Sequence, residues 1–410
     1  MSQFSRKDFL RISALASATL MIPKFLRGET PESKTALDQL FLPATNGKRL
    51  IVVQLTGGND GLNMVVPYGD DVYHSNRPTV GIKSAQVLRM NDYFGFNPGM
   101  TGVHNLYNSG QFAVLNAVGY DNPNRSHFRS LDIWQSASDA DKYIQSGWIG
   151  RWLDASNSGN IIKPHLAVEI DDAMSLALKG NNVKGIGTRN PKRMRLLTED
   201  QLLMQIANDY KHHDSDHPLV DYLHKSLSET SQSASYLIEK SRAGKPKSIY
   251  PQHSFGKQMK TVAELILGGS ETVIYYVSLP GFDTHAGQNG QQNRLLKVYS
   301  EAIDAFSNDM KDAGLWNETL VMTFSEFGRR VKQNASQGTD HGTANVVMLA
   351  GGNLKNKGVL NEAADLTNLN EGDLIHKLDF RQVYATILQN WLGTDAEIVL
   401  GRKFGLLNFV

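Results

Sequence analysis

Short apolar runs rich in β-branched residues alternate along this chain with segments of helical periodicity, an order that few folds accommodate. The first run, Arg49 to Leu55, ends at Thr56-Gly57-Gly58 and is typical of a buried strand. Similar runs predict strands at 111–118, 165–170, 272–279, 319–324 and 345–350. Strands separated by helices favour an α/β fold whose mostly parallel sheet is covered by helices on both faces.

Helices are predicted between these strands and at the end of the chain. Residues 291–315 repeat apolar side chains every three or four positions, and Asp379 is a plausible N-cap for a last helix. Residues 190–268 have helical patterns without strand signals, which predicts a helical insertion or lid within a single α/β domain at 48–410.

The N-terminal segment has the features of an export signal. Ser5-Arg6-Lys7-Asp8-Phe9 is followed by an apolar run at 12–22, shorter than a membrane span. The pattern is similar to a twin-arginine signal with Lys7 in place of the second Arg, and general secretory export or an amphipathic helix is the alternative. Residues 1–27 are therefore expected to be a signal and 28–47 a linker, which places the protein in the periplasm or outside the cell.

Composition excludes several classes of function. Lys and Arg number 42 against 41 Asp and Glu, so no positive excess drives binding to nucleic acid. The chain has no Cys, which excludes thiolate nucleophiles, disulfides and Cys-metal sites. No apolar run is long enough to predict a transmembrane span. Catalysis would have to use hydroxyls, carboxylates, imidazoles and amides.

Polar side chains collect where the predicted strands end, the usual place for functional groups in α/β sheets. Carboxylates and imidazoles there suit one or two divalent metal ions: zinc, manganese or magnesium, and calcium less well. The candidate ligands are Asp60, Asp283, His285, Glu326, Asp340 and His341. Singly, each also fits a turn residue, a helix cap, an interior histidine or a structural ion pair.

Ser126 is the candidate nucleophile. It opens a predicted helix at 128–136, where the helix dipole favours an anion, and a nearby metal would lower the pKa of its hydroxyl. Ser126 also fits a simple N-cap. Arg125 and Arg129 are candidate clamps for a tetrahedral oxyanion, or solvent-facing charges.

Five of these segments together resemble a family of exported bacterial proteins placed in the alkaline phosphatase-like superfamily, beside sulfatases and cofactor-independent phosphoglycerate mutases. The resemblance spans about 48 to 395. The segments are Gly57-Gly58-Asn59-Asp60-Gly61, Arg125-Ser126-His127-Phe128, Phe282-Asp283-Thr284-His285, Phe324-Ser325-Glu326-Phe327-Gly328-Arg329 and Gly338-Thr339-Asp340-His341-Gly342.

The resemblance implies an alkaline phosphatase/sulfatase-like sheet with two metal ions and a serine nucleophile. Asp60 matches a metal-binding Asp after the first strand, and Ser126 matches the nucleophile. Glu326 takes the Asp position of an Asp-His-Gly triplet. The remaining matches are ligand pairs, Asp283 with His285 and Asp340 with His341.

Three departures from the superfamily pattern concern the metal ligands. Phe327 stands where a metal-binding His is usual, the Asp283-x-His285 spacing is short, and the only later His is His376. The sequence therefore favours an exported metal-dependent hydrolase of phosphate or sulfate esters, carried on small molecules or glycans. The alternatives are a non-catalytic binding or assembly protein on the same fold, and a phosphoryl transferase or mutase.

Overall fold

The computed structural model of the chain describes residues 47–157, 162–194 and 218–410. The predicted signal at 1–27 and the linker up to residue 46 lie outside these residues. Their assignment stays a prediction.

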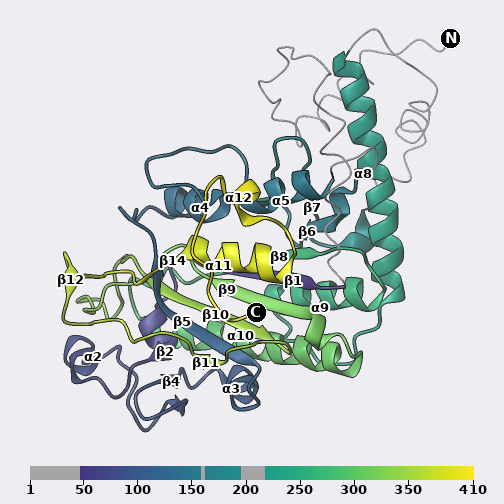
Figure 1. The fold of residues 1–410 in the computed structure, drawn as a ribbon. Coiled ribbons are helices and arrows are strands. Elements are labelled where there is room, and N and C mark those ends of the chain that lie inside the picture. The colour runs from purple at the N-terminus through teal and green to yellow at the C-terminus, as the bar shows by residue number, and fades with distance from the viewer. Residues whose placement is uncertain (1–46, 158–161, 195–217) are drawn as a thin grey trace, which may run out of the picture. The chain divides into compact units, whose positions relative to one another are not determined.

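The described residues form one large sheet and two small ones. The large sheet has the strand order β11-β5-β10-β9-β1-β8-β6-β7, with β14 also paired to β5 (Figure 1). Its strands are β1 (Arg49–Thr56), β5 (Phe112–Gly119), β6 (Ala167–Glu169), β7 (Ile186–Gly187), β8 (Ile274–Pro280), β9 (Thr319–Phe324), β10 (Asn345–Gly351), β11 (Gly358–Val359) and β14 (Leu378–Asp379). The small sheets comprise β2 (Val65–Val66), β3 (Leu88–Arg89) and β4 (Gly95–Phe96), and the hairpin of β12 (Leu369–Asn370) with β13 (Asp373–Leu374).

The prediction of a mostly parallel sheet is confirmed. Among the described strands of the large sheet, β10 alone runs antiparallel, to both β5 and β9. The helices are α2 (Asp71–Asn76), α3 (Thr101–Asn108), α4 (His127–Ser136), α5 (Trp148–Ser156), α8 (Pro218–Ala243), α9 (Ser254–Leu267), α10 (Gln288–Asp312), α11 (Phe380–Thr386) and α12 (Ala396–Leu400). No helix in the described ranges is both long and apolar enough to cross a bilayer.

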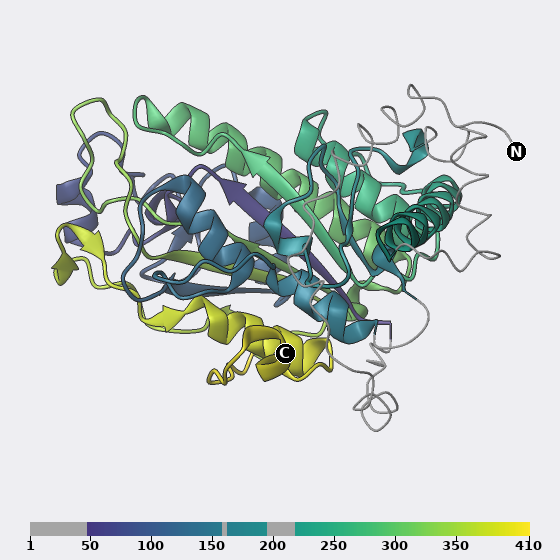
Figure 2. The same cartoon turned by 90° about the horizontal axis from the view of Figure 1, so that it is seen from above.

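Side-chain alternation along the strands divides the core in two. Leu50 and Val52 of β1 pack in one apolar cluster with residues of α4, α5, α11 and α12, while Ile51 and Val53 join α3, α9 and α10 in the other. Figure 2 shows the sheet between these two helical layers. The helices therefore cover both faces, as predicted.

The segment predicted as an insertion contains two described helices with different surroundings. α9 packs against α10 and β8, and its Phe255, Met259 and Val262 are fully buried, so it belongs to the layer that covers the sheet. α8 packs against α9. Residues 195–217, which also belong to the predicted insertion, lie outside the described part of the chain.

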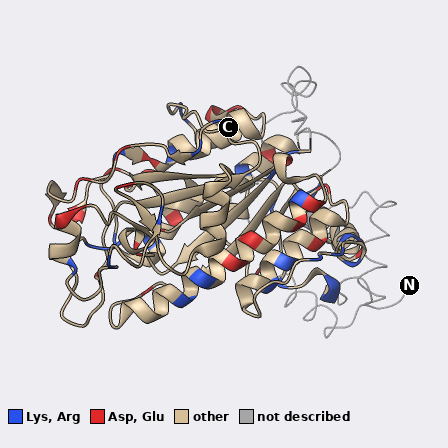
Figure 3. Cartoon of the chain, turned by 90° about the horizontal axis from the view of Figure 1, so that it is seen from below, with Lys and Arg blue, Asp and Glu red and all other residues tan. Residues whose placement is uncertain are grey.

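Basic and acidic residues are interspersed along the helices in the view of Figure 3. This distribution agrees with the near-zero net charge of the sequence.

Candidate metal centre

The topology brings the predicted site loops to one edge of the sheet. β1 lies between β8 and β9 and is parallel to both, so the loops that follow these three strands leave at the same edge. An isolated bridge between Arg329 and His341 brings the 338–342 loop to the same place.

Helix α4 contributes one more side chain, His127, to the place where these loops meet. The helix is anchored by Trp134, whose ring stacks on Phe324 of β9 at 4.9 Å and on Phe380 of α11 at 4.3 Å. Its N-cap is Ser126 and its first residue is His127. The packing of one tryptophan thus fixes the helix end from which His127 reaches the loops.

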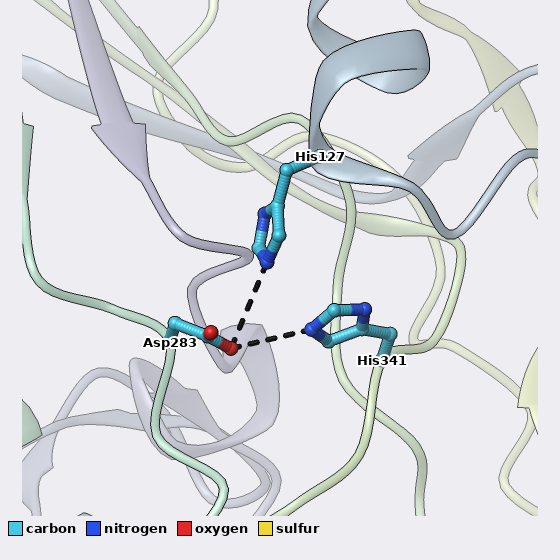
Figure 4. Close-up of side chains that lie close together, drawn as sticks. All are labelled: His127, Asp283 and His341. Atoms are coloured by element: carbon cyan, nitrogen blue, oxygen red, sulfur yellow. Dashed lines mark hydrogen bonds and ion pairs between the residues drawn. The ribbon is translucent and has the colours of Figure 1, made fainter.

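His127, Asp283 and His341 form the centre of the site, with one ligand-type atom from each lying within 4.8 Å of the others (Figure 4). The Asp283 Oδ1 atom is 3.2 Å from His341 Nε2 and 3.7 Å from His127 Nε2. His285 joins them, because its Nε2 atom lies 3.0 Å from Asp283 Oδ1 and 3.0 Å from His341 Nε2. Three imidazole nitrogens and one carboxylate oxygen therefore converge.

Each of the three histidines is held at its other nitrogen by an oxygen acceptor. His127 Nδ1 is 2.9 Å from Glu326 Oε1, and His285 Nδ1 is 3.3 Å from Asp340 Oδ1. His341 Nδ1 is 2.9 Å from the carbonyl oxygen of Arg125. These oxygens only accept hydrogen bonds, so a neutral imidazole places its proton on Nδ1 and leaves the Nε2 lone pair directed at the centre.

The chemistry of these donor groups, three imidazoles and one carboxylate, fits a metal ion. Metal-binding histidines usually donate their second N–H to a carboxylate or a backbone carbonyl, as all three do here. Without a cation the Nε2 lone pairs would face one another and the Asp283 carboxylate. The buried Nε2 atom of His127 has no hydrogen-bond partner among the described residues. Imidazole and carboxylate donors suit zinc and manganese and accept other divalent ions.

The charges around the centre favour ionised Asp283. Burial opposes ionisation, but the hydrogen bond from Arg329 (2.7 Å), the contact with His341 and the positive charge of Arg329 lower the pKa of Asp283 to about 2. The hydrogen bond to Glu326 raises the pKa of His127, whereas burial lowers that of His341. Asp283 is therefore available as an anionic ligand at every pH at which the protein would work.

Phe327 forms an apolar wall beside the imidazoles. Its ring centroid is 4.8 Å from that of His127 and 4.7 Å from that of His341. The Phe327 ring leaves no space for a side chain at Gly58, because a Cβ atom there would lie 2.1 Å from the ring. Gly58 also has a φ of +65°, which favours glycine. The residue that departs from the superfamily pattern thus packs against two of the candidate ligands.

Asp60 lies outside the cluster in a buried network of its own. Its Oδ2 atom accepts hydrogen bonds from Arg77 and from Gln288, both at 2.5 Å, and its side chain is fully buried. Arg77, which caps α2, is equally buried. The guanidinium supplies the positive charge that the resemblance assigns to a metal ion at this position.

The other predicted site residues divide between rim and interior. Ser126 is exposed, and its side chain makes no capping hydrogen bond. The Arg125 guanidinium pairs with buried Asp373 and, at 3.7 Å, with Glu371. Arg129 is buried, and its Nη2 donates to the carbonyls of residues 139, 140 and 142. The Nη2 atom of Arg129 is therefore held by backbone carbonyls inside the protein.

Of the predicted ligands, the structure brings together Asp283, His285, Asp340 and His341. Glu326 does not face the centre itself, because its carboxylate contacts the Nδ1 atom of His127. His127 itself was not among the predicted ligands. Its position directly after the N-cap of a helix that follows a strand-end loop is the signal that indicates it. Buried Glu326 also accepts the Gly57 N–H at 2.8 Å, which fixes its carboxylate behind the imidazole.

Residues 47–407 match the family described as "Protein of unknown function (DUF1501)". No curated protein sequence matches. Similar solved structures include a protein in the alkaline phosphatase superfamily from Vibrio parahaemolyticus (10% identity, TM-score 0.40, covering 98% of this chain and 80% of that one). Two others are the lipoteichoic acid synthase LtaP from Listeria monocytogenes (10%, 0.38, 97% and 82%) and the zinc complex of the C-terminal periplasmic domain of EcEptC from Escherichia coli (10%, 0.38, 75% and 73%).

Proposed function

The chain belongs to the DUF1501 family, and from that premise we propose that it is an exported metal-dependent hydrolase of phosphate or sulfate esters. The observation that carries the proposal is the convergence of three imidazole Nε2 atoms on the Asp283 carboxylate, each imidazole held by an acceptor behind it. Such a site binds a divalent cation and presents it at the loop edge of the sheet.

We propose one ion rather than two. His127, His285, His341 and Asp283 would hold it, and Glu326 and Asp340 would orient two of the imidazoles. The second position implied by the resemblance would need Asp60, whose carboxylate is already neutralised by Arg77 inside the protein. A buried carboxylate with a guanidinium partner is a poor ligand, because releasing it would leave the guanidinium charge unpaired.

In the proposed hydrolysis, the metal ligands, Ser126 and the N-terminus of α4 would have different roles. A divalent cation bound here would lower the pKa of a nearby hydroxyl and neutralise charge on the transferring group. Ser126, exposed at the N-terminus of α4, would attack phosphorus or sulfur in line, forming the new ester bond while the bond to the substrate's alcohol oxygen breaks. The proton lost by the serine hydroxyl would end on the leaving alcohol. Water would then release phosphate or sulfate from the serine. The N-terminal dipole of α4 favours the anion throughout.

Export is part of the proposal and depends on the N-terminal sequence. The basic start and apolar run of residues 1–27 support transport to the periplasm or beyond, by the twin-arginine or the general secretory route. In that compartment the substrates would be phosphate or sulfate esters of small molecules or glycans.

Metal analysis tests the site. Mass spectrometry of purified protein should find about one equivalent of a divalent metal, lost in His127→Ala and in Asp283→Ala. His104→Ala is the matched control, because His104 lies on α3 and contacts the Arg89 carbonyl. Wild-type protein that takes up no zinc, manganese or magnesium, or variants that keep their metal, would refute the proposed centre.

Turnover tests the chemistry separately. Metal-loaded wild type should hydrolyse a phosphate or sulfate monoester, and Ser126→Ala should keep its metal but lose turnover. Ser126→Ala with full activity would remove the serine from the mechanism and leave the metal centre standing.

A further inference from the structure

Two arginine side chains next to the metal centre share one buried carboxylate. Asp373 is 1% exposed, its Oδ2 atom pairs with the Arg125 guanidinium, and its Oδ1 atom lies 3.4 Å from Arg330 Nε. Both arginine side chains are more than a third exposed, so a ligand can reach them. Arg125 directly precedes Ser126, which brings the pair to the segment that carries the proposed nucleophile.

Asp373 is supplied by the hairpin of β12 and β13. In the turn of this hairpin Glu371 has a φ of +52°, a left-handed conformation that residues other than glycine adopt at a cost. The Leu374 carbonyl accepts a hydrogen bond from the Thr343 hydroxyl at 2.5 Å, which ties the hairpin to the segment that follows His341. The position of the Asp373 carboxylate is therefore fixed by the fold.

Both arginines contact residues of the metal centre through their backbone. The Arg125 carbonyl oxygen lies 2.9 Å from His341 Nδ1, and the Arg330 N–H donates to the Asp340 carbonyl at 3.0 Å. A hydrogen bond from Asn334 lowers the pKa of Asp340, and the charge of Arg330 lowers it further. The arginine pair is therefore close enough for its charge to act on a ligand bound at the centre.

The charges around the centre balance once a divalent cation is held there. In the described part of the chain, three guanidinium groups and five carboxylates are linked to the centre or to the arginine pair by ion pairs, so they carry two negative charges when the imidazoles are neutral. With a divalent cation the sum is zero, and the N-terminal dipole of α4 adds about half a positive charge. The groups are Arg125, Arg329, Arg330, Asp283, Asp340, Asp373, Glu326 and Glu371.

A site with this balance suits a ligand that has one negative charge. The second charge of a dianion would lose hydration on entering the site without gaining a further positive partner. Sulfate monoesters and phosphate diesters carry one charge at neutral pH, whereas a phosphate monoester carries about 1.5 to 2.

We propose that the site selects esters with a single negative charge, and that Asp373 determines this selectivity by neutralising the arginine pair. The inference rests on the proposed function, because that function places the ester at the metal centre. It narrows the substrate class to sulfate monoesters and phosphate diesters. Without the Asp373 charge, Arg125 and Arg330 would favour a doubly charged phosphate monoester.

Stable anions test the selectivity without turnover. Calorimetry of the metal-loaded protein at about pH 8 would compare phenylphosphonate, mostly a dianion at this pH, with its methyl monoester and benzenesulfonate, which are monoanions. All three carry the same ring, so they differ mainly in the anionic group. Wild type should bind at least one monoanion more tightly than the dianion, and the preferred monoanion identifies the phosphate diester or the sulfate class.

Two charge variants should move this preference in opposite directions. Asp373→Asn leaves the arginine pair without its counter-charge and should shift the affinity ratio about tenfold toward the dianion. Arg330→Gln removes a positive charge and should shift the ratio toward the monoanions, which keeps the test informative if Asp373→Asn does not fold. Glu362→Gln is the matched control, because Glu362 is 89% exposed and pairs with Lys377, so the same change in net charge should leave the ratio unchanged.

The outcomes separate this inference from the proposed function. Binding of the dianion to wild type as tightly as the monoanions, a ratio that neither Asp373→Asn nor Arg330→Gln changes, or an equal shift in Glu362→Gln would overturn the selectivity and leave the metal centre intact. Failure of all three anions to bind protein that holds its metal would refute the proposed function as well.

Discussion

Glu169 is a buried carboxylate whose ionisation should make the protein less stable as the pH rises. It lies in β6 and is 4% exposed, and its carboxylate accepts a hydrogen bond from the Ser175 N–H at 2.7 Å. Burial raises the pKa of Glu169 from 4.5 to about 7, although the hydrogen bonds from Ser175 lower it. The folded state therefore keeps a proton over a pH range in which the unfolded state has released it.

The sign and size of the effect follow from these two pKa values. Between pH 4.5 and about 7 the folded state binds more protons than the unfolded state, so the free energy of unfolding falls as the pH rises. At about 1.4 kcal/mol per pKa unit, the difference corresponds to about 3 kcal/mol once both states are ionised. Glu169→Gln stays neutral and can still accept from Ser175. The variant should match wild type near pH 4 and exceed its stability by about 3 kcal/mol near pH 8.

Urea unfolding followed by tryptophan fluorescence from about pH 4 to pH 9 measures this difference. Glu271→Gln is the matched control, since its hydrogen bond with Lys163 lowers the pKa of Glu271 and its ionised form stabilises the fold. That substitution should change stability in the opposite direction and by less, because both partners are largely exposed. Wild type and Glu169→Gln with the same pH dependence would refute burial as the source of the effect.

Two further predictions concern the metal centre. Glu326→Gln removes the charge behind His127 and should weaken metal affinity about 10- to 100-fold, measured by chelator competition; unchanged affinity would contradict the orienting role. Gly58→Ala should lower the unfolding free energy by about 2 kcal/mol and weaken metal binding, because its Cβ would lie 2.1 Å from Phe327. Gly269→Ala, with a similar positive φ but open space, isolates the backbone contribution, and an equal loss in both variants would exclude the clash.

The sheet was predictable because its signal is local. Buried strands such as β1 and β9 are continuous apolar runs, so their positions follow from composition within a few residues. The rule that loops follow the carboxyl ends of parallel strands then placed Asp283 and His285 in one region. The antiparallel direction of β10 between β9 and β5 has no such local signal, because a run of apolar residues predicts a buried strand without indicating whether it is parallel or antiparallel.

The roles of individual side chains depend on partners distant in the sequence. Asp60 follows β1 as a ligand would, but Arg77 reaches it from the end of α2, and no spacing rule indicates that contact. His127 and Glu326 are 199 positions apart in the sequence, and the hydrogen bond that gives each its role forms only in the folded protein. Sequence patterns thus identify the edge of the sheet on which chemistry is possible, and the folded structure decides which groups face one another.

The balance of charge at that edge gives an independent argument for a divalent ion. The three carboxylates of Asp283, Glu326 and Asp340 surround the imidazoles, and Arg329 is the cation in direct contact with Asp283. With neutral imidazoles, these groups carry two uncompensated negative charges. Two imidazolium ions would balance the same charges, but their Nε2–H groups would then crowd around one carboxylate oxygen, and like charges repel. One divalent cation balances the same charges and satisfies all three Nε2 lone pairs. Because the hydrogen bond to Glu326 raises the pKa of His127 while burial lowers that of His341, metal loading should release no more than about one proton at neutral pH, and release of about two protons in a pH-stat titration would contradict this account.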